Sequence, residues 1–322
     1  MKKQEKIFVI GHKNPDTDSI CSAIAYCDIK NRTTQDSKYI AKRAGQINEE
    51  TEYVLNRFGV QPPGYLSNIG TQVKDMDIRL SPEANKSMSL KNAWDLMQEN
   101  SIVSLPIREK DGTLEGLITI GDIAKTYMDT TDSYLLSRAR TQYQRIAETI
   151  GGKVVEGNGH GYFIQGKIMV ATANPDKMKE YVEENDMIIM GNREEDHLQA
   201  IEQNVSCIIV GLGIEVTEKV LKLAHEKDII IISSPYDTFT ISRLINQSIP
   251  VKYIMKTESL VTFNTEDFTD DIQDVMIKHR HRAFPVIDKK GKCIGTISRR
   301  NFLDMHRKKV VLVDHNEKDQ AV

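Results

Sequence analysis

The sequence predicts an α/β protein, in which a parallel-sheet domain is interrupted by a pair of repeated modules and by a further α/β domain. Three observations lead to this fold class. A short apolar run at residues 7–10 opens the chain, and a similar run occurs at residues 309–313. Between them, one pattern of helix, strand, turn and strand occurs twice, and several short apolar runs separate the two copies. A length of 322 residues exceeds the usual size of one domain and agrees with this division.

Composition narrows the class of protein. Charged residues make up 28% of the chain and hydrophobic residues 39%, as in ordinary globular proteins. A net charge of −3 provides no field that would hold a polyanion, so we expect no nucleic-acid partner. We also expect no membrane partner, because no apolar run approaches the length of a bilayer span. The four cysteines follow neither a metal nor a disulfide spacing, which predicts a cytoplasmic protein.

The first apolar run leads directly into one histidine and two aspartates. Residues 7–10 are predicted to form a buried parallel strand. His12, Asp16 and Asp18 follow at its carboxyl end, where open α/β sheets place their sites. Mixed imidazole and carboxylate ligands suit divalent cations. We expect Pro15 to keep the loop extended, so that the two carboxylates point the same way. The alternative is a turn whose acids cap the next helix, although a cap does not require the histidine.

The two copies of the repeated module align without a gap at a separation of 179 residues. Pro106 corresponds to Pro285, and Gly116 corresponds to Gly295. Each copy is predicted to contain a helix, two strands joined by a turn, and a second helix. The first helices are expected at 90–99 and 270–278, and the strands at 103–108, 114–119, 283–288 and 293–298. Two copies form a pair rather than a solenoid.

The first copy carries a motif at residues 116–122, which read GLITIGD. This motif resembles the signature of the CBS domain, a family whose members pair and form two clefts for adenine nucleotides. The resemblance implies that Thr119 and Asp122 bind nucleotide. A hydroxyl beside helix N-terminal amides suits a phosphate, and a carboxylate can accept hydrogen bonds from both ribose hydroxyls. We therefore expect AMP, ADP, ATP or a diadenosine polyphosphate as a regulatory ligand.

The second copy departs from this signature. Ser298 keeps the hydroxyl, Asn301 stands where the aspartate belongs, and Arg299 adds a group that suits phosphate. An asparagine can still hydrogen-bond a sugar, so these three residues are the predicted binding residues of this copy. The two clefts should then differ in nucleotide affinity. The alternative is a structural pair that binds no ligand.

Between the copies we expect a separate α/β domain, in which short apolar runs alternate with polar helical stretches. Its predicted strands are 153–155, 168–171, 187–190, 207–210 and 229–233. The segments at 151–155, 191–195 and 234–238 resemble the DRTGG domain. Three histidines lie on different predicted elements and are expected to be exposed or on helix surfaces rather than catalytic. They are His160, His197 and His225.

The last apolar run, residues 309–313, repeats the arrangement of the first and ends at Asp314. Beside His12, Asp16 and Asp18, this residue adds a third carboxylate, which could bridge two metal ions about 3.5 to 4 Å apart. The alternative is an aspartate at a strand end that caps a helix.

Residues 11–19 and 313–317 together resemble the DHH phosphoesterases, and within them the family II inorganic pyrophosphatases. Thr17 and Ser19 distinguish this family from nuclease relatives, which usually have glycine and alanine at these positions. Residues 41–51 also resemble the pyrophosphatases. The resemblance covers the whole chain, because this family includes members with a CBS, DRTGG and CBS insertion.

The resemblance implies hydrolysis of pyrophosphate with two manganese or cobalt ions, while Mg²⁺ accompanies the substrate. His12, Asp16 and Asp314 are expected to hold one ion, and Asp18 and Asp314 to share in the second. It also implies a homodimer formed through the CBS domains and regulation by adenine nucleotides. Rival expectations are a phosphodiesterase that cleaves short oligonucleotides or cyclic dinucleotides, and an adenine-nucleotide sensor without catalysis.

Family members continue past the second acidic segment to an Asp-His-His motif and a C-terminal domain that binds substrate, which this sequence does not contain. The resemblance therefore implies that the DHH domain of this sequence is truncated and that the chain is inactive by itself. The expected domains are the first part of the DHH domain (1–70), the first CBS domain (71–130), the DRTGG-like domain (131–250), the second CBS domain (251–308) and the resumed DHH domain (309–322).

Overall fold

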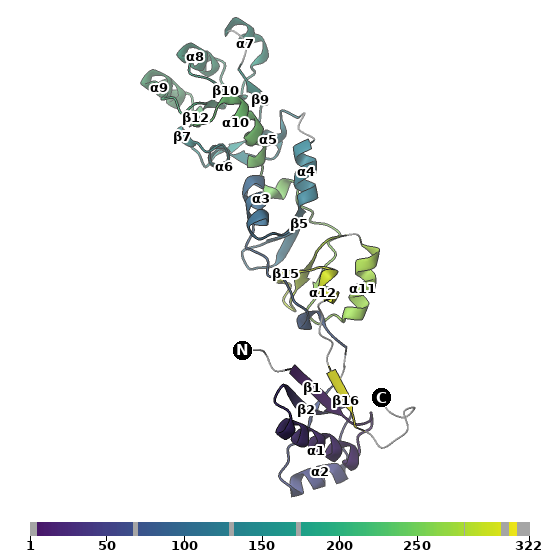
Figure 1. Cartoon of the computed structure of the whole chain (residues 1–322). Coiled ribbons are helices and arrows are strands. Elements are labelled where there is room, and N and C mark those ends of the chain that lie inside the picture. The colour runs from purple at the N-terminus through teal and green to yellow at the C-terminus, as the bar shows by residue number, and fades with distance from the viewer. Residues whose placement is uncertain are drawn as a thin grey trace. The chain divides into compact units, whose positions relative to one another are not determined.

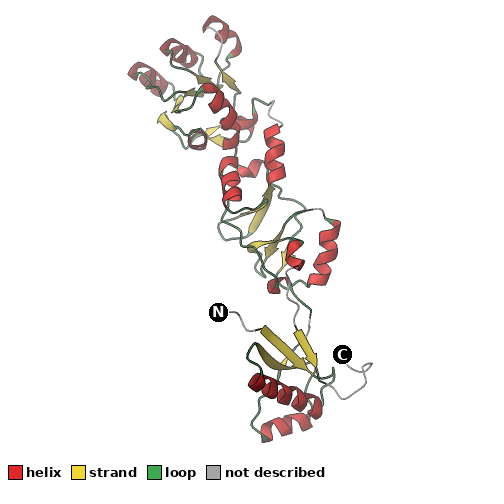
Figure 2. Ribbon diagram, viewed as in Figure 1, coloured by secondary structure: helices red, strands yellow, loops and turns green. Residues whose placement is uncertain are grey.

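The computed structural model describes residues 5–66, 70–128, 132–171, 175–279, 281–303 and 309–313. Helices and strands are mixed along the chain (Figure 2), which confirms the predicted α/β class. The chain forms two compact units. The first comprises residues 1–78, 263–281 and 298–322, and the second comprises residues 79–262 and 282–297.

A parallel sheet lies in the first unit, with the strand order β16-β1-β2-β3. Its strands are β1 (Glu5–Ile10), β2 (Ser37–Arg43), β3 (Gly64–Tyr65) and β16 (Lys309–Leu312). β16 pairs with β1 from Lys309 opposite Ile7 to Leu312 opposite Ile10 (Figure 1). The last apolar run of the sequence therefore forms a strand beside the first, in the same parallel sheet.

Two helices follow the first two strands of this sheet, α1 (Thr17–Thr33) after β1 and α2 (Glu49–Arg57) after β2. Each begins at a side chain that accepts a hydrogen bond from a backbone N–H of the first turn. Asp16 accepts from Ser19 N and Asn48 accepts from Thr51 N, both at 2.8 Å. An N-cap of this kind contributes about 1 kcal/mol.

The first unit also contains η1 (Val73–Asp75), β13 (Phe263–Asn264), α11 (Thr269–Lys278) and α12 (Arg300–Leu303). Backbone hydrogen bonds join segments that are far apart in the sequence. Val73 N donates to Asp267 O and Thr269 N donates to Thr71 O, both at 2.9 Å. These bonds connect the chain ahead of the first repeat copy with the second copy.

The second unit holds the first repeat copy and the hairpin of the second copy. The first copy contains α3 (Leu90–Glu99), β4 (Ser104–Arg108), β5 (Leu114–Thr119) and α4 (Ile120–Met128), and the hairpin of the second is β14 (Phe284–Ile287) and β15 (Cys293–Ile297). Both hairpins are antiparallel and have an irregularity at equivalent positions. The bounds of α3 and α11 coincide at the separation of 179 residues, which confirms the repeat.

Between these copies lies an α/β domain whose sheet has the order β7-β12-β11-β10-β9. Strands β9 to β12 are parallel, and β7 runs antiparallel to β12. The strands are β7 (Lys153–Glu156), β9 (Ile168–Val170), β10 (Met187–Met190), β11 (Cys207–Val210) and β12 (Ile230–Ser233), and a separate pair is β6 (Thr141–Gln142) with β8 (Tyr162–Phe163). The helices are α5 (Leu135–Arg138), α6 (Tyr143–Thr149), α7 (Pro175–Tyr181), α8 (Glu194–Glu202), α9 (Glu218–Glu226), α10 (Thr238–Leu244) and η2 (Ile245–Ser248). The helical turn η3 (Val251–Tyr253) follows at the start of the second repeat copy.

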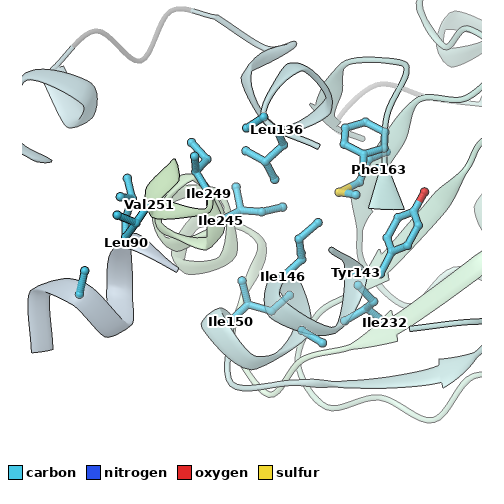
Figure 3. Packing of buried hydrophobic residues seen from close by; sticks show 14 of the residues in the cluster. Leu90, Leu136, Tyr143, Ile146, Ile150, Phe163, Ile232, Ile245, Ile249 and Val251 are labelled. Atoms are coloured by element: carbon cyan, nitrogen blue, oxygen red, sulfur yellow. The ribbon is translucent and has the colours of Figure 1, made fainter. Parts of the chain in front are cut away.

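Both faces of this sheet are buried, because successive side chains of a strand point to opposite faces. On one face, Ile208 and Val210 pack with residues of α7, α8 and α9. On the other face, Ile209 belongs to a cluster with residues of α6, α10 and η2. Figure 3 labels three members of this cluster, Ile146 of α6, Ile232 of β12 and Ile245 of η2. That cluster includes Leu90 of α3 in the first repeat copy and Val251 at the start of the second copy, so the domain shares one hydrophobic core with both segments.

Gly152, just ahead of β7, leaves no room for a side chain. A Cβ at this position would lie 2.3 Å from the carbonyl oxygen of Ser233 in β12. Because the obstacle is backbone, Gly152→Ala is expected to lower the free energy of unfolding by about 1 to 3 kcal/mol, measured by urea denaturation. Gly191 is the matched control, since a Cβ there would meet nothing within 4 Å. Equal unfolding midpoints for the two alanine variants would contradict this prediction.

None of the helices in the described part of the chain combines the length and the apolar character that a membrane span requires.

Candidate functional site

The predicted ligand loop lies at the carboxyl end of β1. β1 ends at Ile10 and α1 begins at Thr17, so the loop between them carries His12 and Asp16. Nε2 of His12 lies 3.5 Å from Oδ1 of Asp16, and the two side chains are 16% and 48% exposed. These two side chains are close enough to bind one cation, and both reach solvent.

Asp18 is placed differently from Asp16. The backbone of Asp16 is extended, with φ of −90° and ψ of −176°, and its side chain caps α1. Asp18 already lies in the first turn of α1, where its Oδ1 accepts a hydrogen bond from Ser22 Oγ at 3.2 Å. The expectation of an extended backbone at both aspartates is therefore wrong at Asp18, because the cap starts the helix at Thr17. The capping role that the sequence left open for these acids is present at Asp16.

Among the described residues, no group of three or more His, Cys, Asp or Glu side chains is gathered closely enough to hold a metal ion. The structure brings His12 and Asp16 together, and Asp314 lies outside the described residues. β16 nevertheless ends beside Ile10, at the same sheet edge as the loop. An imidazole with carboxylates remains a donor set that fits Mn²⁺ or Co²⁺, so the metal assignment of all four residues stays a prediction.

Three of the four cysteines, Cys27, Cys207 and Cys293, are buried. Burial raises the pKa of the Cys27 thiol to about 11, and it also raises the pKa of Cys207 and of Cys293. Burial thus disfavours the thiolate form, as expected for small core residues.

In the first repeat copy, Thr119 and Asp122 bond to each other at the junction of β5 and α4. Oδ2 of Asp122 accepts from Thr119 Oγ1 at 2.6 Å and from Thr119 N at 3.0 Å. Oδ1 of Asp122 lies 3.4 Å from Nζ of Lys256. Lys256 is held there because its backbone exchanges hydrogen bonds with Leu117, both at 2.9 Å. The two predicted binding residues thus lie together, and a lysine that the sequence analysis did not assign lies beside them.

In the second copy, Ser298 and Asn301 reproduce the same arrangement. Oδ1 of Asn301 accepts from Ser298 N at 2.7 Å and from Ser298 Oγ at 2.8 Å. Its Nδ2 donates to the carbonyl oxygen of Asp77 at 2.7 Å. An aspartate in this position would place a carboxylate oxygen against that carbonyl oxygen, whereas the amide supplies a donor. This contact gives a physical reason for the departure from the signature.

Arg299 has structural partners at the end of α11. Its Nε donates to Met276 O at 3.2 Å, and one terminal nitrogen donates to His279 O at 3.0 Å. A guanidinium suits the carbonyl groups at a helix C-terminus, which carry partial negative charge. A phosphate would have to compete with these carbonyls, so the phosphate role of Arg299 stays a prediction.

The three histidines of the middle domain do not form a site. His160 and His225 are exposed as expected, and Nδ1 of His225 lies 3.0 Å from Glu156. His197 is 3% exposed, with Nε2 at 2.8 Å from the carbonyl oxygen of Gly191. The expectation of a surface position for His197 is wrong, because α8 turns this residue toward the preceding loop, where a backbone acceptor satisfies it.

Two family models match the chain. The CBS domain matches residues 77–129 and 251–308, and the DRTGG domain matches residues 145–248. These matches lie on the repeat copies and on the α/β domain between them.

A cobalt-dependent inorganic pyrophosphatase of Clostridium perfringens is 38% identical over 320 residues, which cover 99% of this chain and 58% of that protein. A solved structure of the CBS and DRTGG domains from the regulatory region of the C. perfringens pyrophosphatase, in complex with its activator diadenosine tetraphosphate, is 33% identical. It superposes with a TM-score of 0.67, over 71% of this chain and 100% of that one. The chain belongs to the family II inorganic pyrophosphatases.

Another member of this family is similar along the whole chain. A probable manganese-dependent inorganic pyrophosphatase of Thermotoga maritima is 30% identical over 321 residues, or 100% of this chain and 58% of that protein. The chain thus spans less than two thirds of the length of the two curated pyrophosphatases that it matches from end to end.

Proposed function

We propose that the protein hydrolyses pyrophosphate to two phosphates and that it uses manganese or cobalt ions for this reaction. The observation that carries the proposal is the loop after β1, where an imidazole and a carboxylate lie 3.5 Å apart at a sheet edge. His12, Asp16, Asp18 and Asp314 would hold the ions. The metals named for the relatives from C. perfringens and T. maritima support this choice.

Bound divalent ions would lower the pKa of water and offset the charge of the substrate, which Mg²⁺ would accompany. The residues of the loop have separate tasks. His12 and Asp16 would bind from the loop itself, and Asp18 would bind from the first turn of α1. The N-terminus of α1 carries partial positive charge, which favours a phosphate group beside it.

We further propose that adenine nucleotides bind at the CBS pair and regulate the hydrolysis. The complex of the C. perfringens regulatory region with diadenosine tetraphosphate supports this proposal. Thr119 and Asp122 would bind in one cleft, and Ser298, Arg299 and Asn301 in the other. Regulation requires that a nucleotide bind two conformations of the pair with different affinities.

A homodimer formed through the CBS helices is part of this proposal. Three large apolar side chains of α3 and α4 are exposed: Trp94 by 38%, Tyr127 by 43% and Met128 by 79%. Trp94 and Tyr127 also line a cavity of about 310 Å³ between these helices and η2. A second copy of the chain would remove this apolar surface from water. Sedimentation velocity measures whether the protein is a monomer or a dimer.

We also propose a cytoplasmic location, which fits the four free cysteines.

The test is phosphate release from pyrophosphate by the full-length protein supplied with Mn²⁺ or Co²⁺. Release should stop when a chelator removes the metal and resume when the metal is restored. Cleavage of dinucleotides without cleavage of pyrophosphate would replace the proposal by the phosphodiesterase. Nucleotide binding without either activity would leave a non-catalytic sensor.

A further inference from the structure

A chain of hydroxyl groups connects the ligand loop with the start of α2. Thr51 is fully buried, and its Oγ1 lies 3.1 Å from Oγ1 of Thr17 and 2.7 Å from Oδ1 of Asn48. Thr17 stands between the predicted ligands Asp16 and Asp18. The contact therefore joins two segments that the sequence analysis noted separately, the acidic loop and residues 41–51.

The direction of these hydrogen bonds follows from the donors and acceptors. Oδ1 of Asn48 also accepts from Thr51 N at 2.8 Å, and a backbone N–H can only donate, so the oxygen of the amide must face Thr51. The hydroxyl proton of Thr51 then goes to Asn48. Oγ1 of Thr51 is left to accept, and Thr17 must donate to it. The hydroxyl of Thr17 thus has one defined orientation. Its proton points to Thr51, so toward the loop its oxygen can only accept a hydrogen bond.

Close packing holds the rest of the loop. A Cβ on Gly45 would lie 2.5 Å from the carbonyl oxygen of Lys13 and 2.7 Å from Cδ of Pro15. A Cβ on Gly11 would lie 1.7 Å from Oγ of Ser19. The loop therefore packs closely against Gly45 and, at Gly11, against α1, while Thr51 contacts the first turn of α1 through Thr17.

We propose that Thr51 is a positioning residue of the metal site: through Thr17 it fixes where the carboxylates of Asp16 and Asp18 lie. This inference rests on the proposed metal-dependent function. Groups that orient metal ligands typically change metal affinity by about 10-fold to 100-fold when they are removed. The hydroxyl of Thr51 acts through Thr17, which is next to Asp16 and Asp18 in the sequence but is not a ligand itself. We therefore expect an effect at the lower end of that range.

The experiment measures the dissociation constant of Mn²⁺, by electron paramagnetic resonance of the free ion and by calorimetry. Thr51→Val keeps the shape and removes the hydroxyl, and it should raise the dissociation constant roughly tenfold. Thr51→Ser restores the hydroxyl and should return the constant to within about twofold of wild type. Thr17→Val should match Thr51→Val, and the double variant should lose no more than either single one, because each change removes the bond between the two hydroxyls. Thr51→Val also removes the hydroxyl donor to Asn48, whose Oδ1 still accepts from Thr51 N.

Thr240 provides a matched control. It lies three residues after the N-cap Asp237 of α10, donates its N–H to Asp237 at 2.7 Å, and belongs to the other unit. Thr240→Val should leave Mn²⁺ affinity unchanged. Wild-type affinity in Thr51→Val or in Thr17→Val, or additive losses in the double variant, would overturn the positioning role while the metal site stands. Unchanged affinity in Asp16→Asn would overturn the metal site and the positioning role together.

Discussion

Changing Asp16 to asparagine is expected to lower the rate of pyrophosphate hydrolysis by the full-length protein by roughly a thousandfold or more, while the fold is preserved. The loss of a charged ligand removes several kcal/mol of transition-state stabilisation by the metal, and about 1.4 kcal/mol corresponds to a factor of ten in rate. The fold should persist because asparagine caps a helix about as well as aspartate does. The amide oxygen can still accept the hydrogen bond from Ser19 N, which Asp16 accepts at 2.8 Å.

The control for this variant is Asp237→Asn. Asp237 is the N-cap of α10 and accepts from Thr240 N at 2.7 Å, in the unit that lacks the ligand loop. Both variants should unfold at the urea midpoint of wild type in the absence of metal, and only Asp16→Asn should lose Mn²⁺ binding and activity. If Asp16→Asn retained the wild-type rate, Asp16 would be a helix cap and nothing more.

The strands of the middle domain and the elements of the repeat are predictable from the sequence because their signals are local. The strands Met187–Met190 and Cys207–Val210 are short, continuous apolar runs bounded by polar residues, and the structure has both at the predicted bounds. The helices α3 and α11 are predictable because the same pattern occurs in both repeat copies, so each copy supports the assignment of the other. The strands β6 and β8, which form one short pair, carry too few residues for a pattern and are not predicted from the sequence.

The contacts that shape the candidate sites could not be read in the same way, because they join residues far apart in the sequence. Lys256 lies near Asp122 only because its backbone pairs with Leu117. Asp77 meets Asn301 across more than two hundred residues. The hydroxyl chain of Thr17 and Thr51 joins two helices that start after different strands. A spacing pattern cannot reveal such pairs, although residues 41–51 did stand out by resemblance.

The second large effect concerns the first nucleotide cleft. Asp122→Asn is expected to weaken binding of AMP or ATP there by about 1 to 3 kcal/mol, which is roughly 5-fold to 150-fold, measured by calorimetric titration. A carboxylate can accept hydrogen bonds from both ribose hydroxyls, one on each oxygen. An amide has only one acceptor oxygen, and its NH2 group, which donates, would face the second hydroxyl. The change also removes the negative partner of Lys256, which lies 3.4 Å from Oδ1.

The fold around this cleft should tolerate Asp122→Asn, because Asn301 already makes the equivalent contacts with Ser298 in the second copy. Asp122→Ala is the contrasting variant. It removes both the ribose acceptor and the oxygen that accepts from Thr119, so it should lose nucleotide affinity and also about 1 kcal/mol of stability. Nucleotide affinity that is unchanged in both variants would show that Asp122 serves the junction of β5 and α4 alone, and the CBS pair would then have to bind its ligand through other residues.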